Sequence, residues 1–288
     1  DNLRFSNAID ATTNGSGQIV CRSTLTNPNN GCVPLNIFGI GVASPAAIAY
    51  VKGIASQTQA ITQQVAALSV NGTPFDTWAG PVSFAGGFEY RKESVTAIGD
   101  PVSAGFTIGP ASYPSTLGGF FTGNFKSNTG SYDVKEFFGE VVAPLLKDSA
   151  LGRSLDVNAA VRFTNYSTAG SVTTWKAGVT YEPIEDIRFR VVRSRDIRAP
   201  NLQEMFVAGS SQAADVTDPQ LPAGATNPVR IFAITDGNAA LRPEVANTLG
   251  LGVVLAPRFL PGFSASFDYY NSKLANALQR LTVNQIAN

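Results

Sequence analysis

Hydrophobic and polar residues alternate along most of the chain that follows residue 59. In SLDVNAAVRFTNYS (154–167), the odd-numbered positions from Leu155 to Phe163 are apolar, and the even-numbered positions are polar apart from Ala160. The same period of two recurs in 82–94, 171–183, 248–257 and 263–272. Because successive side chains of a strand point to opposite faces, the pattern predicts β-strands with one apolar and one polar face.

The connections between these segments alternate between short and long. Short turns are predicted at 76–81, 147–154, 183–186 and 258–262, a short link at 167–171, and long Gly/Ser/Asn/Pro-rich segments at about 95–130 and 200–242. This spacing predicts eight strands in up-and-down order, each about 10 to 13 residues long. Residues 1–58 are expected to form a loop region with a short helix, since Ser44 can cap a helix that begins at Pro45. Residues 59–288 supply the strands and loops, and the whole chain is treated as one domain.

Two architectures use strands of this kind, the soluble β-sandwich and the membrane β-barrel. Sandwich strands usually run about 5 to 6 residues, whereas about 9 to 11 residues cross a bilayer with tilt. Charged residues make up 15% of the chain, against roughly 25% in soluble domains. Aromatic side chains near strand ends on the apolar face resemble the girdles of outer-membrane barrels; they are Tyr90, Phe163, Trp175, Tyr181 and Tyr269. The predicted fold is all-β, an antiparallel up-and-down transmembrane β-barrel with long extracellular loops.

The charged residues of the strands fall on the polar positions. Arg162 or Lys176 would each cost about 2 to 4 kcal/mol if it faced lipid at mid-depth, so the polar face is predicted to line the lumen. The predicted lumen-facing charged residues are Glu89, Arg91, Glu136, Glu140, Arg162, Lys176, Glu182, Arg188 and Arg190. They are expected either to form a solvated wall in which charges pair across strands, or to contact an internal plug or a passing ligand.

The composition argues against several other functions. The chain has no histidine, which excludes Ser-His-Asp and Cys-His mechanisms. Glu136 and Glu140 would lie roughly 13 Å apart on one strand, too far for the carboxylate pair of a glycosidase, which spans about 5 to 9.5 Å. The 21 basic and 21 acidic residues cancel, so nothing suggests a nucleic-acid surface. We expect no enzymatic activity, no cofactor and no nucleic-acid partner.

Cys21 and Cys32 flank a polar, turn-rich segment. Two cysteines without a histidine or a second pair make a poor zinc site, so no metal site is predicted. The pair forms either a disulfide that closes the loop, which suits an oxidising location, or two free thiols.

No stretch of the sequence reads as a transmembrane helix. The most apolar candidate, 36–51, contains a proline and is shorter than the roughly 20 residues that a spanning helix needs. The N-terminus lacks the features of a signal peptide, and both ends read as interior sequence. We therefore expect the chain to be a segment of a longer protein.

The order of the motifs resembles the barrel of TonB-dependent outer-membrane receptors. The residues that carry the resemblance are VCRSTLTNPNNGCVPLNIFGIGVASPAAIAYV (20–51), AGPVSFAGGFEYRKES (79–94), YDVKEFFGEVVAPLL (132–146), WKAGVTYEPIEDIRFRVVRSRDIRAPNLQEMF (175–206), LRPEVANTLGLGVVLAPRFLPGFSASFDYYN (241–271) and the following KLANAL. Each segment alone is weak evidence for this family, but the whole series in this order and spacing is specific to it.

The resemblance implies a barrel of about 22 strands around an N-terminal plug. Such receptors lie in the outer membrane of Gram-negative bacteria and import scarce solutes, such as ferric siderophores, cobalamin or oligosaccharides, with energy from the TonB complex. Because this chain shows no plug, no TonB-contacting box and no terminal strand ending in an aromatic residue, it is expected to be the central or C-terminal part of the barrel. Its implied partners are outer-membrane lipid, lipopolysaccharide, the plug and the TonB complex.

Two alternatives to an importer stay open. One is a complete small barrel that acts as a passive pore or an anchor, and the other is a secreted β-sandwich binding module. Candidate ligand contacts lie in the two long loops: Tyr113, Phe120, Phe121, Phe125, Arg230 and Phe232.

The segment SRDIRAPNLQEMF (194–206) is predicted to be the outer end of a strand and the start of a loop. Pro200 lacks an N–H group and biases Ala199 towards extended geometry, which ends regular pairing. Val191 and Val192 interrupt the alternation, so Arg193 or Arg195 would face outward near lipid headgroups unless a bulge returned them to the lumen.

Overall fold

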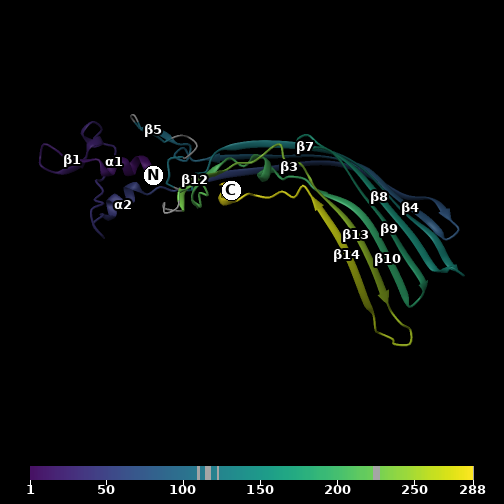
Figure 1. Cartoon of the computed structure of the whole chain (residues 1–288). Coiled ribbons are helices and arrows are strands. Elements are labelled where there is room, and N and C mark those ends of the chain that lie inside the picture. The colour runs from purple at the N-terminus through teal and green to yellow at the C-terminus, as the bar shows by residue number, and fades with distance from the viewer. Residues whose placement is uncertain (109–110, 114–117, 122, 223–227, 288) are drawn as a thin grey trace.

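One eight-stranded antiparallel sheet dominates the computed structural model (Figure 1). The structure describes residues 1–108, 111–113, 118–121, 123–222 and 228–287. The strands of the sheet are β3 (Gln57–Thr77), β4 (Gly80–Gly99), β7 (Asn128–Ser149), β8 (Gly152–Tyr166), β9 (Gly170–Ile184), β10 (Ile187–Arg198), β13 (Glu244–Leu255) and β14 (Ala265–Ala275). Their order is β14-β13-β10-β9-β8-β7-β4-β3, so each strand pairs with its neighbours in sequence. The predicted eight strands and their up-and-down order are confirmed.

The helices and small hairpins lie at one end of this sheet, and the short turns lie at the other (Figure 1). The helices are α1 (Asn2–Ile9), α2 (Pro45–Val51), α3 (Leu202–Phe206), α4 (Val283–Ala287) and the 3₁₀ turn η1 (Arg22–Leu25). The hairpins are β1 (Ala11–Thr13) with β2 (Ile19–Cys21), β5 (Phe106–Ile108) with β6 (Ala111–Tyr113), and β11 (Ser210–Val216) with β12 (Val229–Thr235). In the ranges that the structure describes, no helix is long and apolar enough to span a membrane.

The N-terminal helices follow local capping rules. As predicted, α2 has Pro45 as its first residue, and the Ser44 hydroxyl accepts the N–H of Ala47 at 3.1 Å. The sequence analysis did not predict α1, whose N-terminus is capped by the side chain of Asp1.

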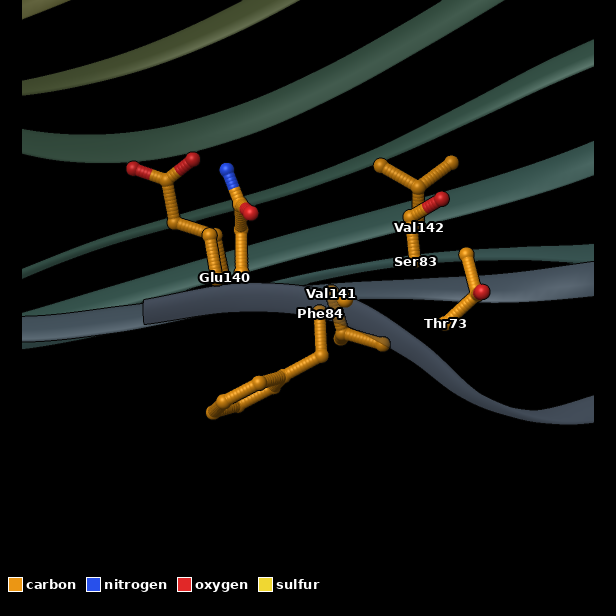
Figure 2. Close-up of a pocket in the computed structure, with 9 residues that line it drawn as sticks. Thr73, Ser83, Phe84, Glu140, Val141 and Val142 are labelled. Carbon is orange, nitrogen blue, oxygen red and sulfur yellow. The ribbon is translucent and has the colours of Figure 1, made fainter. Parts of the chain in front are cut away.

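The register of the strands separates the side chains into two faces. Figure 2 shows this division on β4 and β7, where Ser83 and Glu140 lie on one side of the ribbons and Phe84 and Val141 on the other. We call the side of Glu140 the polar face and the side of Phe84 the apolar face. Val141 lies opposite Phe84 in the ladder, so neighbouring strands keep the two faces in phase.

The apolar face exposes large hydrophobic side chains across the whole sheet. These are Leu68, Val70, Phe84, Phe137, Val141, Val161, Phe163, Trp175, Val179, Phe189, Val191, Leu251, Phe267 and Tyr269. Soluble monomers rarely expose a continuous apolar surface of this extent, whereas the outside of a membrane barrel requires one.

Five strands are longer than the predicted 10 to 13 residues, so that prediction is wrong for them. β8 and β9 exceed it slightly, with 15 residues each, and the other three exceed it by more. β3, β4 and β7 contain 21, 20 and 22 residues. The start of β3, QTQAITQQ (57–64), shows no clean alternation, but its backbone continues in register until Gln57 lies opposite Gly99. The tight turn after Thr77 brings β3 and β4 together, and their backbone pairing therefore extends β3 beyond the residues whose side chains alternate between apolar and polar.

These long strands rise above the neighbouring hairpin of β8 and β9. Tyr166, the last residue of β8, lies opposite Val134 of β7, which lies opposite Arg91 of β4. β4 continues from Arg91 to Gly99, which is about 26 Å further along at 3.3 Å per residue.

Helix α3 packs on the polar face at this end of the sheet. Its Leu202 and Met205 join a buried cluster with strand residues, and the cluster consists of Val95, Tyr132, Val134, Tyr166, Leu202 and Met205. A Cβ atom on Gly130 of β7 would lie 2.1 Å from Cγ of Phe206, so the glycine lets the Phe206 ring lie directly on the strand. The Asn128 side-chain amide also donates a hydrogen bond to the Phe206 carbonyl at 2.5 Å.

Replacing Gly130 with valine is expected to displace α3 from the sheet. Overpacking of this kind costs about 1 to 3 kcal/mol, and the loop that follows Arg198 should become more sensitive to protease in detergent. Gly139→Val is the matched control on the same strand, because a Cβ there meets no atom within 4 Å. Equal protease sensitivity of the two variants would contradict this packing.

Candidate functional site

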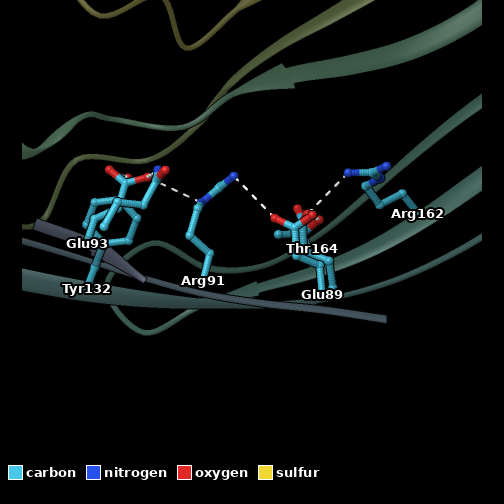
Figure 3. Close-up of polar contacts among 8 residues, drawn as sticks. Glu89, Arg91, Glu93, Tyr132, Arg162 and Thr164 are labelled. Carbon is cyan, nitrogen blue, oxygen red and sulfur yellow. Dashed lines mark hydrogen bonds and ion pairs between the residues drawn. The ribbon is translucent and has the colours of Figure 1, made fainter. Parts of the chain in front are cut away.

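The polar face of β4, β7 and β8 carries a network of charged side chains (Figure 3). Arg91 lies between two carboxylates of its own strand, with Nε 3.2 Å from Oε1 of Glu93 and Nη1 3.5 Å from Oε1 of Glu89. The Tyr132 hydroxyl of β7 donates to Oε2 of Glu93 at 2.7 Å. These contacts connect two strands near the rim and compensate the charge of Arg91.

Glu136 is the centre of a second group in the same network. Its side chain is only 8% exposed, so its charge needs local compensation. Arg162 Nη1 lies 3.1 Å from one carboxylate oxygen, and the Thr164 hydroxyl donates to the other at 2.8 Å. The Arg162 guanidinium also lies 5.1 Å from the centre of the Phe138 ring. The Glu136 carboxylate is therefore held in place by its neighbours and has a structural role on the polar face.

The later strands carry further ion pairs on the polar face. Arg188 pairs with Glu182, and Arg190 of β10 reaches both carboxylate oxygens of Asp268 on β14 at 2.9 and 3.2 Å. β13 lies between these two strands, and its Gly252 is opposite both Arg190 and Asp268. A Cβ at Gly252 would lie 2.3 Å from Asp268 Oδ1, so the glycine leaves room for the pair to cross over β13.

The structure places all nine predicted lumen-facing residues on the polar face. Of these, Glu89, Arg91, Glu136, Arg162, Glu182, Arg188 and Arg190 form ion pairs. Glu140 and Lys176 form no ion pair with the residues that the structure describes. The surface is polar but largely neutralised by its own contacts, which suits contact with water or with a polar protein surface.

Arg198, at the end of β10, joins the sheet to α3, and the sequence analysis did not single it out. It donates to Glu244 of β13 through Nε at 2.6 Å, and through Nη1 to both oxygens of Glu204 at 3.0 Å. Glu204 also closes a capping box with Asn201, which starts α3. The spacing Asn-x-x-Glu is the signal from which this helix could have been predicted.

Arg198→Met is expected to loosen α3, because the carboxylates of Glu204 and Glu244 would lose the cation between them. Limited proteolysis should cut the segment between α3 and β13 several-fold faster in this variant. Arg195→Met is the control on the same strand, since Arg195 forms no ion pair with the described residues. An unchanged cleavage rate for Arg198→Met would show that the bridge does not hold the helix.

The candidate ligand contacts fall on two separate parts of the loop surface. Phe120 is buried, and its ring approaches Gly53 so closely that a Cβ there would lie 2.5 Å away. Phe121 and Phe125 are exposed, and the side chain of Tyr113 lies outside the described part of the structure.

Arg230 and Phe232 lie on the hairpin of β11 and β12. Both are exposed, and Arg230 forms a two-point ion pair with Asp215 across the hairpin at 2.9 and 3.0 Å. The guanidinium holds the pKa of Asp215 below its ordinary value by hydrogen bonding. Arg230 is therefore already neutralised by Asp215.

In the structure, Cys21 and Cys32 form a disulfide that closes the loop containing η1. Among the residues that the structure describes, no group of three or more His, Cys, Asp or Glu side chains could hold a metal ion.

Reduction of this disulfide is expected to loosen residues 22–31. A cross-link that closes a loop of this size removes roughly 3 kcal/mol of chain entropy from the open state. Amide hydrogen exchange in this segment should therefore speed up with a reductant or in a Cys21→Ser/Cys32→Ser variant. Exchange in β8 and β9 serves as the internal reference. Unaltered exchange in residues 22–31 would mean that the surrounding contacts alone order the loop.

Comparison with known proteins identifies the family of this sheet. A family model described as TonB dependent receptor-like, beta-barrel matches residues 4–288. The chain belongs to the TonB-dependent receptor β-barrels. This result confirms both the resemblance read from the sequence motifs and the predicted class of partial antiparallel barrel.

Solved TonB-dependent receptors share the fold of this chain. A double mutant of the ferric enterobactin receptor PfeA from Pseudomonas aeruginosa is 17% identical, with a TM-score of 0.52 over 75% of this chain and 27% of that receptor. A mutant of the same receptor in complex with enterobactin gives 16% identity, a TM-score of 0.50 and the same coverage. No match was found among the curated proteins. At these identities the likeness shows the fold alone, and the chain spans 27% of the length of these receptors.

Proposed function

We propose that this chain is part of the wall of an outer-membrane importer, which takes up a scarce solute with energy from the TonB complex. The observation that supports this most is the open sheet, apolar on one face and lined with paired charges on the other. A wall of a large barrel needs this division, because one side meets lipid and the other meets water or a plug.

The edges of the sheet favour a wall segment over a small complete barrel. In the described ranges, β3 and β14 each pair with only one strand of the sheet and not with each other. A strand edge in the hydrocarbon layer leaves backbone N–H and C=O groups unsatisfied at several kcal/mol each. Neighbouring strands on both sides would remove this cost. An eight-stranded pore would require these two edges to meet, and a soluble sandwich would have to cover the apolar face.

A ferric siderophore is the solute class that we favour. PfeA, the solved receptor named above, is a ferric enterobactin receptor, and we propose the same solute class for this chain. Cobalamin and oligosaccharides are the other classes. Exposed Phe121, Phe125 and Phe232 offer aromatic surface on the loops, which suits a ligand with planar aromatic groups.

The proposed partners follow from the two faces. The apolar face would contact outer-membrane lipid and lipopolysaccharide in a Gram-negative bacterium, and the polar face would contact a plug that transmits force from the TonB complex. The family comprises receptors and transporters, and the proposal assigns no catalytic role to any residue.

Uptake measurements on cells test the import proposal. A strain without this gene is expected to accumulate less radioactive ferric siderophore under iron limitation, and the complete gene should restore uptake. Inactivating the TonB system in the restored strain should abolish that uptake, whereas a passive pore would continue to conduct. Restored uptake that persists without TonB would overturn the proposal of energy-coupled import. If cobalamin or an oligosaccharide enters instead, the importer stands and the siderophore assignment is wrong.

A further inference from the structure

Three cations lie near one another on the apolar face, two on β10 and one on β14, with β13 between them. Arg195 is opposite Asn247, and Asn247 is opposite Lys273. Arg193 lies two residues before Arg195 and is opposite Leu249. We call Arg193, Arg195 and Lys273 the outer cation triad.

The register excludes a bulge that would turn the two arginines towards the polar face. The ladder between β10 and β13 is continuous from Ile187 to Arg198, and the ladder with β9 is continuous from Phe189 to Arg195. Arg195 therefore shares the face of Trp175, and Arg193 shares the face of Ala177. The sequence left two positions open for these arginines, and in the structure both lie on the apolar, outward face.

The outer cation triad has no protein counter-ion in the described part of the chain. Arg193, Arg195 and Lys273 are exposed and belong to none of the ion pairs between described residues. The nearest acid along the strand, Asp196, has the opposite parity and accepts a hydrogen bond from Ser194 at 2.7 Å. Most arginines of the sheet are paired, whereas these three exposed cations are open to an external partner.

The triad lies where the apolar face ends. On β13, Leu251 and Leu249 give way to Asn247, and on β14, Phe267 and Tyr269 give way to Asn271 and then Lys273. Trp175 is opposite Arg195 on the neighbouring strand. Indole rings and cations at the end of an apolar band mark the depth of lipid headgroups.

We propose that the outer cation triad binds the phosphate groups of a phosphorylated glycolipid of the outer leaflet, the lipid part of lipopolysaccharide. This inference rests on the proposed membrane location. Strands lie about 4.8 Å apart, and residues two positions apart on one strand lie about 6.6 Å apart. Arg195 and Lys273 are thus about 10 Å apart, and Arg193 and Lys273 about 12 Å apart, which lets guanidinium groups contact one phosphate while Lys273 reaches the next. Acyl chains attached to that headgroup would lie on Tyr269, Leu251 and their apolar neighbours.

Lipid retention by the purified product of the complete gene tests the proposal. The protein is reconstituted in phosphatidylcholine vesicles that contain either lipid A or the same lipid with its phosphates removed, and the retained glycolipid is measured by native mass spectrometry. Retention should depend on the phosphates, and it should fall as salt rises from about 0.05 to 0.5 M because screening weakens exposed charge pairs. Retention that ignores the phosphates or the salt would overturn the proposal, and neither result depends on a variant.

Variants then test whether the outer cation triad is the site that binds the lipid. Phosphate-dependent lipid retention is expected to fall at least about tenfold in the charge-removing variant Arg193→Gln/Arg195→Gln/Lys273→Gln. Retention should stay close to that of the wild type in the charge-conserving variant Arg193→Lys/Arg195→Lys/Lys273→Arg. The control Lys52→Gln/Lys176→Gln/Arg242→Gln removes the same number of charges elsewhere and should retain the lipid as well. Wild-type retention by the first variant, or equal loss in the control, would overturn the assignment. If the charge-removing variant does not fold, loss of lipid retention in the charge-conserving variant would overturn the assignment.

These results separate this inference from the proposed import. Normal phosphate-dependent retention together with TonB-independent uptake would overturn the import proposal and leave the lipid site standing. TonB-dependent uptake without phosphate-dependent lipid retention would overturn the lipid site and leave the import proposal standing.

Discussion

Backbone pairing between neighbouring strands is the constraint on which the rest of this structure depends. Each strand of the large sheet lies beside its neighbours in sequence, tight turns and backbone pairing together set the register, and the register decides which face every side chain occupies. A slip of one residue in β8 would bring Arg162 to the apolar face and Phe163 to the polar face. The ion pairs of Glu136 and the exposed aromatic surface are thus two results of a single alignment.

The sequence predicted much of this arrangement because its signals are local. Period-two alternation identified strands such as β8 and β9, and glycine- or proline-containing turns located their ends. Three features lay outside those signals. β3 extends through a segment without alternation because β4 pairs with it, α3 starts from a capping box that alternation does not reveal, and α1 depends on a single capping residue, Asp1.

Only part of the candidate site could be read in advance. Alternation assigned the charged residues to one face, but it does not reveal partners on other strands: Arg190 of β10 reaches Asp268 of β14 across the space left by Gly252 of β13. No local pattern specifies a contact between strands so far apart in sequence. The outward position of Arg193 and Arg195 was equally ambiguous, because Val191 and Val192 are compatible with a bulge or with regular pairing. Pairing with both neighbours decides it.

The unequal strand heights have a consequence for where α3 packs. β3, β4 and β7 continue well past the β8–β9 hairpin, so the rim descends in a step along the sheet. The polar face of β4 and β7 beyond Tyr166 therefore has no strand of the β8–β9 hairpin beside it. Tyr132 belongs to the part of β7 that continues past the hairpin, and it is buried there together with Val95 under Leu202 and Met205 of α3. The step in strand height is thus the place where α3 packs, so the segment that follows β10 takes its position from strands much earlier in the chain.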